Sequence, residues 1–462
     1  MSILNQRNRS RSPLLAAVAG VAAWALLCAQ VRLEAQGLRP GEHWVGTWAA
    51  AATSRIDSAP QPQPAAPPAQ QQRQVSNAPG HPLHAGPLPV GAQAPLHFKN
   101  QTLRQIAHVS IGGDRLRVVL TNVFGAAPLR IGAASVALRE KDATIVAGSS
   151  RPLTFSGSRL TTIAPGAVLV SDPVNLNVPA LADLAIDIYL PDDTAAMKSP
   201  ITTHAAAWQT SFVSSAGNHV GAANLPVQTT TGYRRTDGAP TGTWFFLSRV
   251  EVVAPQQTGV VVTLGDSITD GTHSGLDANN RWPDHLARRL AQEKIRMGVL
   301  NMGIGGNRVL IDGNGVSALA RFDRDVLSHP GVTHLIVMEG INDIGNAREN
   351  SDPSAADLIA AYRQIVERAH AHGIKVIAGT LTPYEGANYY TPEGEAKRKA
   401  LNEWLKTSGI FDGVADFDAA TRDPARPTKF LPKFDSGDNL HPNATGYEAM
   451  ANAIDLSLFK SH

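Results

Sequence analysis

Cysteine is almost absent from this sequence of 462 residues: the only one is Cys28, near the N-terminus. The rest of the chain therefore has no thiol nucleophile and no disulfide partner, and a zinc site would need histidine and carboxylate ligands. Leu27 stands before Cys28, where a lipoprotein signal needs a small residue, so we expect no lipidation there. His370 and His372 lie two apart at a predicted helix end and point apart, so we predict neither metal nor cofactor.

An excess of charge of one sign is also missing. The formal net charge is +2, and no long basic run is interleaved with aromatic residues. Nucleic acid is therefore a poor candidate partner. The chain is 43% hydrophobic and 17% charged, which is typical of globular proteins. Its length is enough for two or three domains.

The first residues have the pattern of an export signal. Three arginines, at positions 7, 9 and 11, precede an apolar stretch over residues 14–29, and Ala35 is a plausible cleavage position. The apolar stretch is shorter than the roughly 20 residues that a spanning helix needs. We therefore predict a signal peptide over residues 1–35, a bacterial periplasmic or secreted location, and no stable membrane insertion after cleavage. The alternative is an uncleaved membrane anchor.

The next part of the sequence favours β structure. Residues 43–255 contain short alternating apolar runs, such as Leu184 to Leu190, and little helical periodicity. Residues 112–114 (GGD) stand between two such runs and predict a hairpin. Residues 58–95 are dominated by Pro, Gln, Ala and Gly and predict an extended insertion. We predict an N-terminal β-sandwich domain with this Pro-rich insertion.

From residue 258 to residue 462, apolar strand patterns alternate with helical ones, which predicts an α/β domain built on a parallel sheet with helices on both faces. The expected strands cover residues 260–264, 299–300, 335–338, 376–378 and 414–417. The expected helices cover residues 281–294, 316–327, 354–372, 393–406 and 444–459. In such sheets the functional site lies beyond the carboxyl ends of the strands.

Ser267 follows the first of these strands within the word GDSIT. A serine at a strand-to-helix turn is exposed and rigid, and its N–H can face a bound carbonyl; a capping serine is the alternative. Thr269 stands where the nucleophile elbow of α/β-hydrolases has its second glycine, so that architecture is disfavoured.

Three further words follow strands of the same sheet. Residues 301–307 (NMGIGGN) offer backbone N–H groups, although a plain turn is the alternative. Asn342 offers a side-chain donor suited to an oxyanion, whereas Asp343 is expected to bond backbone N–H groups. His441 lies three residues after Asp438, which can hold one imidazole nitrogen while the other faces the serine. Asp435 competes with Asp438 for that role.

Together these four words resemble the SGNH family, also called GDSL-type hydrolases. The family's Ser, Gly, Asn and His blocks match Ser267, Gly306, Asn342 and His441, with Asp438 as third member of the triad. The resemblance implies a flavodoxin-like three-layer fold. It also implies an oxyanion hole made by the N–H of Ser267, the N–H of Gly306 and the side chain of Asn342. The words look most similar to a branch of esterases associated with xylan degradation.

We therefore expect an exported serine esterase that forms an acyl-enzyme on Ser267, with His441 as base and Asp438 as its orienter. Export, a β-sandwich partner and the branch resemblance favour acyl groups, such as acetyl, on polysaccharide. A lipase or lysophospholipase is the alternative within the same chemistry. A carbohydrate-binding protein without catalysis is the alternative from another class.

Overall fold

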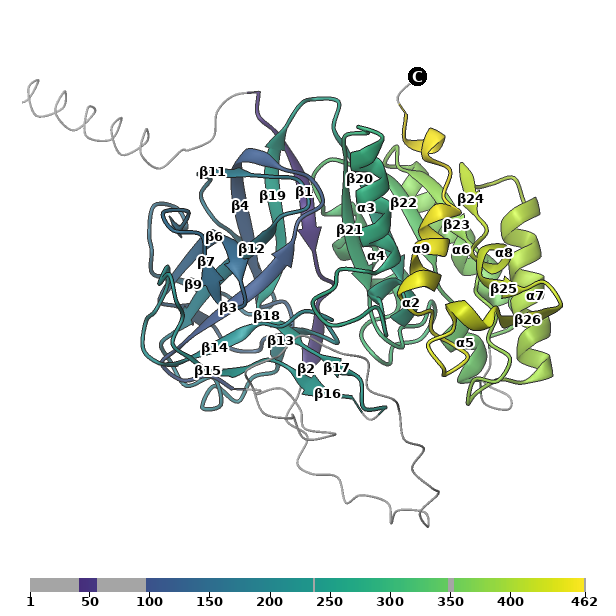
Figure 1. The fold of residues 1–462 in the computed structure, drawn as a ribbon, viewed down its shortest axis with the longest axis horizontal. Coiled ribbons are helices and arrows are strands. Elements are labelled where there is room, and N and C mark those ends of the chain that lie inside the picture. The colour runs from purple at the N-terminus through teal and green to yellow at the C-terminus, as the bar shows by residue number, and fades with distance from the viewer. Residues whose placement is uncertain (1–40, 56–96, 236, 348–352, 461–462) are drawn as a thin grey trace, which may run out of the picture.

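A computed structural model describes residues 41–55, 97–235, 237–347 and 353–460 (Figure 1). The predicted signal peptide over residues 1–35 and the predicted Pro-rich insertion over residues 58–95 lie outside the described residues. Among the helices in the described ranges, none is both long and apolar enough to cross a bilayer.

The N-terminal region is rich in β structure, as predicted, and contains two larger antiparallel sheets (Figure 1). The first consists of β1 (His43–Ala49), β19 (Leu247–Ala254), β4 (Gly113–Thr121), β10 (Val168–Val170) and β11 (Val174–Val178). The second consists of β15 (Val227–Thr230), β14 (Phe212–Ala216), β3 (Gln101–His108), β12 (Asp183–Leu190), β6 (Ala133–Lys141), β7 (Thr144–Ile145) and β8 (Arg151–Leu153). Smaller ladders join β18 (Thr243–Phe245), β13 (Ile201–Ala205) and β2 (Thr53–Arg55); β16 (Tyr233–Arg234) and β17 (Pro240–Thr241); and β5 (Leu129–Ile131) and β9 (Thr161–Ile163).

The hairpin predicted at residues 112–114 is wrong. The strand before it, β3, pairs with β12 and β14, whereas β4 after it pairs with β19, so the chain changes sheets at this point. Neither Gly112 nor Gly113 has the positive φ that a two-residue hairpin turn demands. A Cβ on Gly112 would lie 2.2 Å from the carbonyl oxygen of Val178, so this glycine serves a close approach of two backbones.

Strand β12 keeps the predicted buried face, which carries Leu184, Ile186 and Ile188, each fully buried. Its other face is buried as well. Asp187 there is 2% exposed and forms an ion pair with Arg104, with 2.7 Å between Nε and Oδ1. A period-2 pattern therefore located the strand, but not the polar pair that fills its second face.

The C-terminal region has mixed α/β structure, as predicted. Its sheet has the order β21 (Met297–Gly303), β20 (Gly259–Gly265), β22 (Val332–Met338), β23 (Lys375–Gly379) and β24 (Gly413–Ala415), and each neighbouring pair is parallel. The helices are α2 (Ser267–Asp270), α3 (Trp282–Gln292), α4 (Ala318–Phe322), α5 (Ile341–Gly345), α6 (Ala355–His370), α7 (Pro392–Thr407), α8 (Phe417–Thr421) and α9 (Ala444–Asn452). A short ladder of β25 (Arg422–Asp423) and β26 (Arg426–Phe430) lies before α9, and single turns occur at η2 (Pro432–Phe434) and η3 (Leu456–Phe459).

Every predicted element of this region differs from the structure by at least one residue at an end, and three of them are followed by a different kind of structure. The helix expected over residues 316–327 is α4 followed by a π-helical turn, η1 (Asp323–Leu327). The closing helix expected over residues 444–459 ends at Asn452, and the strand expected at 414–417 ends at Ala415, where Asp416 caps α8. The Asp416 side chain accepts a hydrogen bond from the N–H of Ala419, which favours a helix start over a longer strand.

Helix α3 forms where its periodicity predicts. Trp282, Leu286 and Leu290 lie on one stripe and are at most 1% exposed. Pro283 stands in the first turn, where its missing N–H costs nothing, and Asp284 accepts the N–H of Arg281 at 3.0 Å. The start of this helix follows the loop after Ser267, so its position also fixes that loop.

The two regions meet along strand β1, which lies between β19 and β21 (Figure 1). The N–H of Gly46 donates to the carbonyl of Pro330 at 3.2 Å, and the N–H of Val299 donates to Ser110 Oγ at 2.9 Å. A Cβ on Gly298 would lie 2.3 Å from the carbonyl oxygen of Gly46. Because buried residues of both regions belong to one hydrophobic cluster, the interface is part of the core.

Candidate active site

Ser267 lies at the carboxyl end of β20, between the ends of β21 and β22. It is the first residue of α2, and the preceding Asp266 caps that helix by accepting the N–H of Ile268 at 2.9 Å. A Cβ on Gly265 would lie 2.1 Å from Thr269 Oγ1, so the turn closes only with glycine at this position. The tight turn therefore holds the serine at the edge of the sheet where ligands bind in α/β folds.

His441 connects Ser267 to Asp438. The Nε2 atom of His441 is 2.9 Å from Ser267 Oγ, and its Nδ1 atom is 2.6 Å from Asp438 Oδ2. Because Asp438 faces Nδ1, the proton of neutral His441 belongs on Nδ1, and Nε2 is free to accept the serine hydroxyl. The structure thus brings together the three predicted residues, of which Ser267 and His441 are 174 positions apart in the sequence.

The loop before His441 separates the two candidate aspartates. Asp438 Oδ1 accepts the backbone N–H groups of Leu440 and His441, at 2.9 and 2.8 Å, which fixes the carboxylate beneath the imidazole. Asp435 Oδ1 instead accepts the N–H groups of Gly437 and Asn439. Asp435 therefore shapes the loop, and Asp438 is the carboxylate that contacts the imidazole.

The electrostatics favour a neutral imidazole beside an ionised carboxylate. Burial lowers the pKa of His441; the hydrogen bond and charge of Asp438 oppose this, and the charges of His273 and Arg235 add to the lowering. For Asp438, burial acts to raise the pKa, but contacts with His273 and His441 hold it well below its usual range. A neutral imidazole with an accepting Nε2 is the state that a general base requires.

Gly306 and Asn342 lie beside Ser267 as two possible donors to an oxyanion. Gly306 has φ +75°, and a Cβ there would lie 2.3 Å from Asn314 Nδ2, so glycine is required. Within the described ranges no hydrogen bond uses the Gly306 N–H. Asn342 lies in the first turn of α5, which follows β22. One of its amide hydrogens goes to the carbonyl of Asn307 at 3.0 Å, which leaves the second for a ligand.

Two buried polar side chains hold in place the loop that contains Gly305 and Gly306, here called the glycine loop. Asn307 Nδ2 donates to the carbonyls of Asn314 and Val316, at 3.0 and 2.9 Å. Asp343 accepts the backbone N–H groups of Val309 and Leu310, at 2.9 and 3.2 Å, which is the structural role predicted for it. The loop is therefore fixed from two places, by Asn307 after β21 and by Asp343 after β22.

A pocket of about 480 Å³ opens over Ser267, and both regions of the chain contribute to its wall. Its C-terminal side has mostly small and amide side chains: Ser267, Ile304, Gly305, Gly306, Gly313, Asn314, Gly315, Asn342, Leu440 and His441. Its N-terminal side consists of Thr53, Ser54, His204, Ala205, Ala206 and Arg235. No sequence motif marks this second wall, because its residues come from β-rich segments far from the four words.

His273 is a further residue that the sequence reasoning missed. Its Nε2 atom lies 3.6 Å from Asp438 Oδ2. Its ring centroid lies 5.7 Å from that of His441 and 5.8 Å from that of Trp208, and both pairs of rings are tilted. The possible ligand atoms of His273, Asp438 and His441 lie within 4.8 Å of one another, so this group could hold a metal ion. The hydrogen bonds that Asp438 and His441 already make instead support proton transfer from Ser267 to His441.

Comparison with known proteins agrees with this geometry. Residues 263–449 match the GDSL-like Lipase/Acylhydrolase family. No curated protein matches the chain.

Solved structures resemble part of the chain. A protein of the G-D-S-L family from Desulfitobacterium hafniense is 24% identical, with 42% of this chain and 97% of that one covered, at a TM-score of 0.33. A GDSL-like lipase from Bacteroides thetaiotaomicron is 19% identical, with coverages of 44% and 90% and a TM-score of 0.35. A catalytic mutant of an acetylxylan esterase from Geobacillus stearothermophilus is 20% identical, with coverages of 42% and 91% and a TM-score of 0.33. Likenesses at this level do not decide the substrate.

Proposed function

We propose that this chain is a serine esterase with Ser267, His441 and Asp438 as its triad, an activity that the match of residues 263–449 to the GDSL-like Lipase/Acylhydrolase family supports. The single observation that carries the proposal is the continuous relay of 2.9 and 2.6 Å from Ser267 Oγ through His441 to Asp438. A nucleophile bonded to a base, which is itself oriented by a third group, is the arrangement that acyl transfer requires.

The reaction follows from these contacts. Ser267 Oγ attacks the ester carbonyl while its proton moves to His441 Nε2, and Asp438 stabilises the imidazolium that forms. The N–H groups of Ser267 and Gly306 and the amide of Asn342 stabilise the oxyanion of the tetrahedral intermediate. His441 then gives its proton to the leaving alcohol. Water, deprotonated by the same nitrogen, attacks the acyl-enzyme and releases the acid and free Ser267.

Replacing Ser267 with alanine tests the assignment. S267A should abolish turnover of a simple acetyl ester while its thermal unfolding stays close to that of the unchanged protein. Ser328→Ala is the matched control, because Ser328 is exposed and lies outside the pocket. Turnover by S267A at the rate of the control would overturn the triad. Covalent labelling of Ser267 by an organophosphonate would separate a hydrolase from a binding protein.

We also propose that the acyl group is short and is carried on carbohydrate. Support comes from the pocket wall, where glycine, alanine, serine, threonine and asparagine outnumber the two large apolar side chains, Ile304 and Leu440. A wall of this kind offers hydrogen bonds to a hydroxylated alcohol and little apolar surface to a long acyl chain. Acetate release from acetylated xylan should exceed fatty-acid release from lipid, and a clear preference for long chains would favour the lipase alternative.

The remaining expectations are part of the same proposal. The parallel strand order supports a flavodoxin-like three-layer catalytic domain over residues 258–462, and the two antiparallel sheets support a β-sandwich over residues 43–255. The N-terminal sequence pattern supports export to the periplasm or medium. Determination of the N-terminal residue of protein recovered from those fractions tests cleavage after Ala35.

A further inference from the structure

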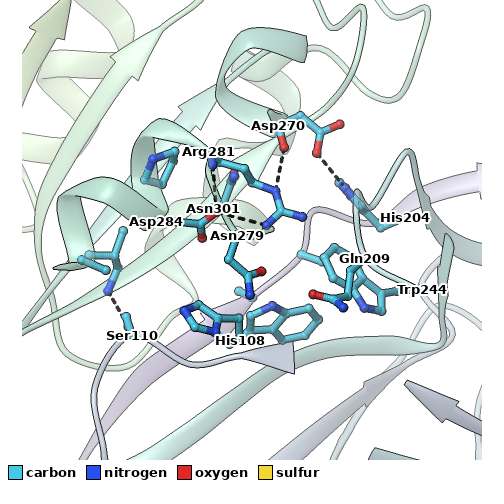
Figure 2. A pocket seen from close by; sticks show the side chains of 16 residues that line it. His108, Ser110, His204, Gln209, Trp244, Asp270, Asn279, Arg281, Asp284 and Asn301 are labelled. Carbon is cyan, nitrogen blue, oxygen red and sulfur yellow. Dashed lines mark hydrogen bonds and ion pairs between the residues drawn. The ribbon is translucent and has the colours of Figure 1, made fainter. Parts of the chain in front are cut away.

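His204, on β13 of the N-terminal region, lines both the catalytic pocket and a smaller cavity at the interface of the two regions. Figure 2 shows the smaller cavity. The smaller cavity has a volume of about 40 Å³, and Asp270 and Arg281 also line it. His204 is 5% exposed, and its ring lies 5.5 Å from that of Trp244. A side chain from one region is thus buried against the catalytic loop of the other.

Both ring nitrogens of His204 have partners. Nδ1 lies 2.7 Å from the carbonyl oxygen of Ala51, which can only accept, so Nδ1 carries a proton. Nε2 lies 3.0 Å from Asp270 Oδ1 and donates to it when the ring is doubly protonated. Burial acts to lower the pKa of His204, but the charge and hydrogen bond of Asp270 outweigh burial and raise it. An imidazolium satisfies both partners.

The Asp270 carboxylate also contacts the glycine loop. Its second oxygen, Oδ2, accepts the backbone N–H of Gly305 at 3.1 Å, and Gly305 immediately precedes Gly306. Asp270 also ends helix α2, which begins at Ser267. One carboxylate therefore connects the helix of the nucleophile, the loop of the oxyanion donor and His204.

Arg281 of the C-terminal region links the main chain of Asp270 to the N-terminal region. Its Nε donates to the backbone carbonyl of Asp270 at 3.0 Å (Figure 2). The same guanidinium donates to the carbonyl of Ala207, which follows β13. Asn301 supplies a restraint from within the C-terminal region, because its side chain donates to the carbonyl of Thr269 and accepts the N–H of Gly303. Loss of the His204 contact should therefore loosen the loop and not destroy it.

We infer that His204 is a positioning residue of the esterase site, which orients the Asp270 carboxylate so that Gly305, and with it the Gly306 N–H, is held for the oxyanion. The inference rests on the proposed function. Its basis is the chain of contacts from Ala51 through His204 and Asp270 to Gly305, in which each donor has one acceptor at 2.7 to 3.1 Å. The N-terminal region is then a part of the catalytic apparatus.

A pair of amide variants separates the two bonds of His204. In H204Q the amide nitrogen takes the place of Nε2, so the bond to Asp270 stays and the bond to Ala51 is lost. In H204N the amide nitrogen takes the place of Nδ1, so the bond to Ala51 stays and the bond to Asp270 is lost. Each variant loses one buried hydrogen bond and the positive charge, so thermal unfolding should report similar losses of stability.

The two variants should differ in catalysis. Removal of an oxyanion donor costs on the order of 10²–10³ in rate, and a displaced donor should cost part of that, so H204N should lower kcat about tenfold. KM should change little, because the contact matters in the transition state. H204Q should lower kcat less than H204N does, because it keeps the bond to Asp270. Equal losses of kcat in both variants, or full activity in H204N, would overturn the inference.

Amide hydrogen exchange at Gly305 separates failure of the inference from failure of the proposed function. The Gly305 N–H should exchange faster in H204N than in H204Q, and equal rates would overturn the link whatever the activity. If the unchanged protein hydrolyses no ester, the proposed function fails, and the exchange comparison still decides whether His204 holds the glycine loop.

Discussion

Replacing Asp438 with asparagine should be as damaging as replacing it with alanine, although asparagine has nearly the same shape. Asp438 Oδ1 accepts two backbone N–H groups, those of Leu440 and His441. In D438N the amide oxygen has to stay on these donors, because an NH₂ group there would face two N–H groups. The amide NH₂ then points at His441 Nδ1.

This orientation reverses the tautomer of His441. A donor facing Nδ1 requires an unprotonated Nδ1, so the ring proton moves to Nε2 and points at Ser267 Oγ. The base can then no longer accept the serine proton. Since the same exchange in a serine protease triad costs about 10⁴ in kcat, we expect a loss of about 10³–10⁴, or roughly 4–5.5 kcal/mol of transition-state stabilisation.

The assay is steady-state hydrolysis of an acetyl ester by D438N, D438A and D435N, with thermal unfolding of each. D435N is the matched control, because Asp435 also accepts two backbone N–H groups but does not contact the imidazole. It should keep kcat within about tenfold, because its amide oxygen can still accept both backbone N–H groups and the imidazole contact is untouched. A loss by D435N equal to that of D438N, or a loss below tenfold in D438N, would refute the tautomer argument.

Two further predictions concern pH. The positive charge of Arg235 contributes to the lowered pKa of His441. R235M should therefore move the acid limb of the kcat/KM profile to higher pH, whereas the control R234M should leave that limb in place. An acid limb that does not move in R235M would contradict this. Burial, the largest influence, raises the pKa of Asp266 from 3.8 to about 7, and a neighbouring buried carboxylate, Glu339, is raised as well. The charged form is penalised in the folded state, so the contribution of Asp266 to stability should be fully present below about pH 4 and be lost towards pH 7. D266N should therefore make unfolding less dependent on pH between these values, and an unchanged dependence in thermal unfolding would count against it.

The α/β region could be predicted from sequence because its signals are local. Each strand is a short apolar run, α3 has a complete helical stripe, and the four words follow strand ends that a parallel sheet brings to one edge. The helix ends were less predictable, because caps such as Asp416 compete with the apolar pattern. The three-residue spacing from His441 favours Asp438 over Asp435, and the loop geometry supplies the physical reason.

The β-rich region could be predicted only in outline. Gly112 and Gly113 have the composition of a hairpin turn. However, β3 pairs with β12 and β4 pairs with β19, and each of these partners lies more than fifty residues away. Long-range pairing leaves no local trace in the sequence. For the same reason His204 and Arg235 gave no sign of the catalytic pocket, since nothing near them carries a motif.

The pairing of β1 with β19 has a consequence for how the chain is made. His43 lies opposite Ala254. During synthesis, β1 can therefore pair with β19 only after more than two hundred further residues have been added. Strand β19 ends five residues before β20 begins. The N-terminal region therefore completes its first sheet only as the strand leading to Ser267 emerges, and until then β1 has unpaired edges that invite pairing with other chains. Fragments cut between the two regions should be hard to obtain in folded form.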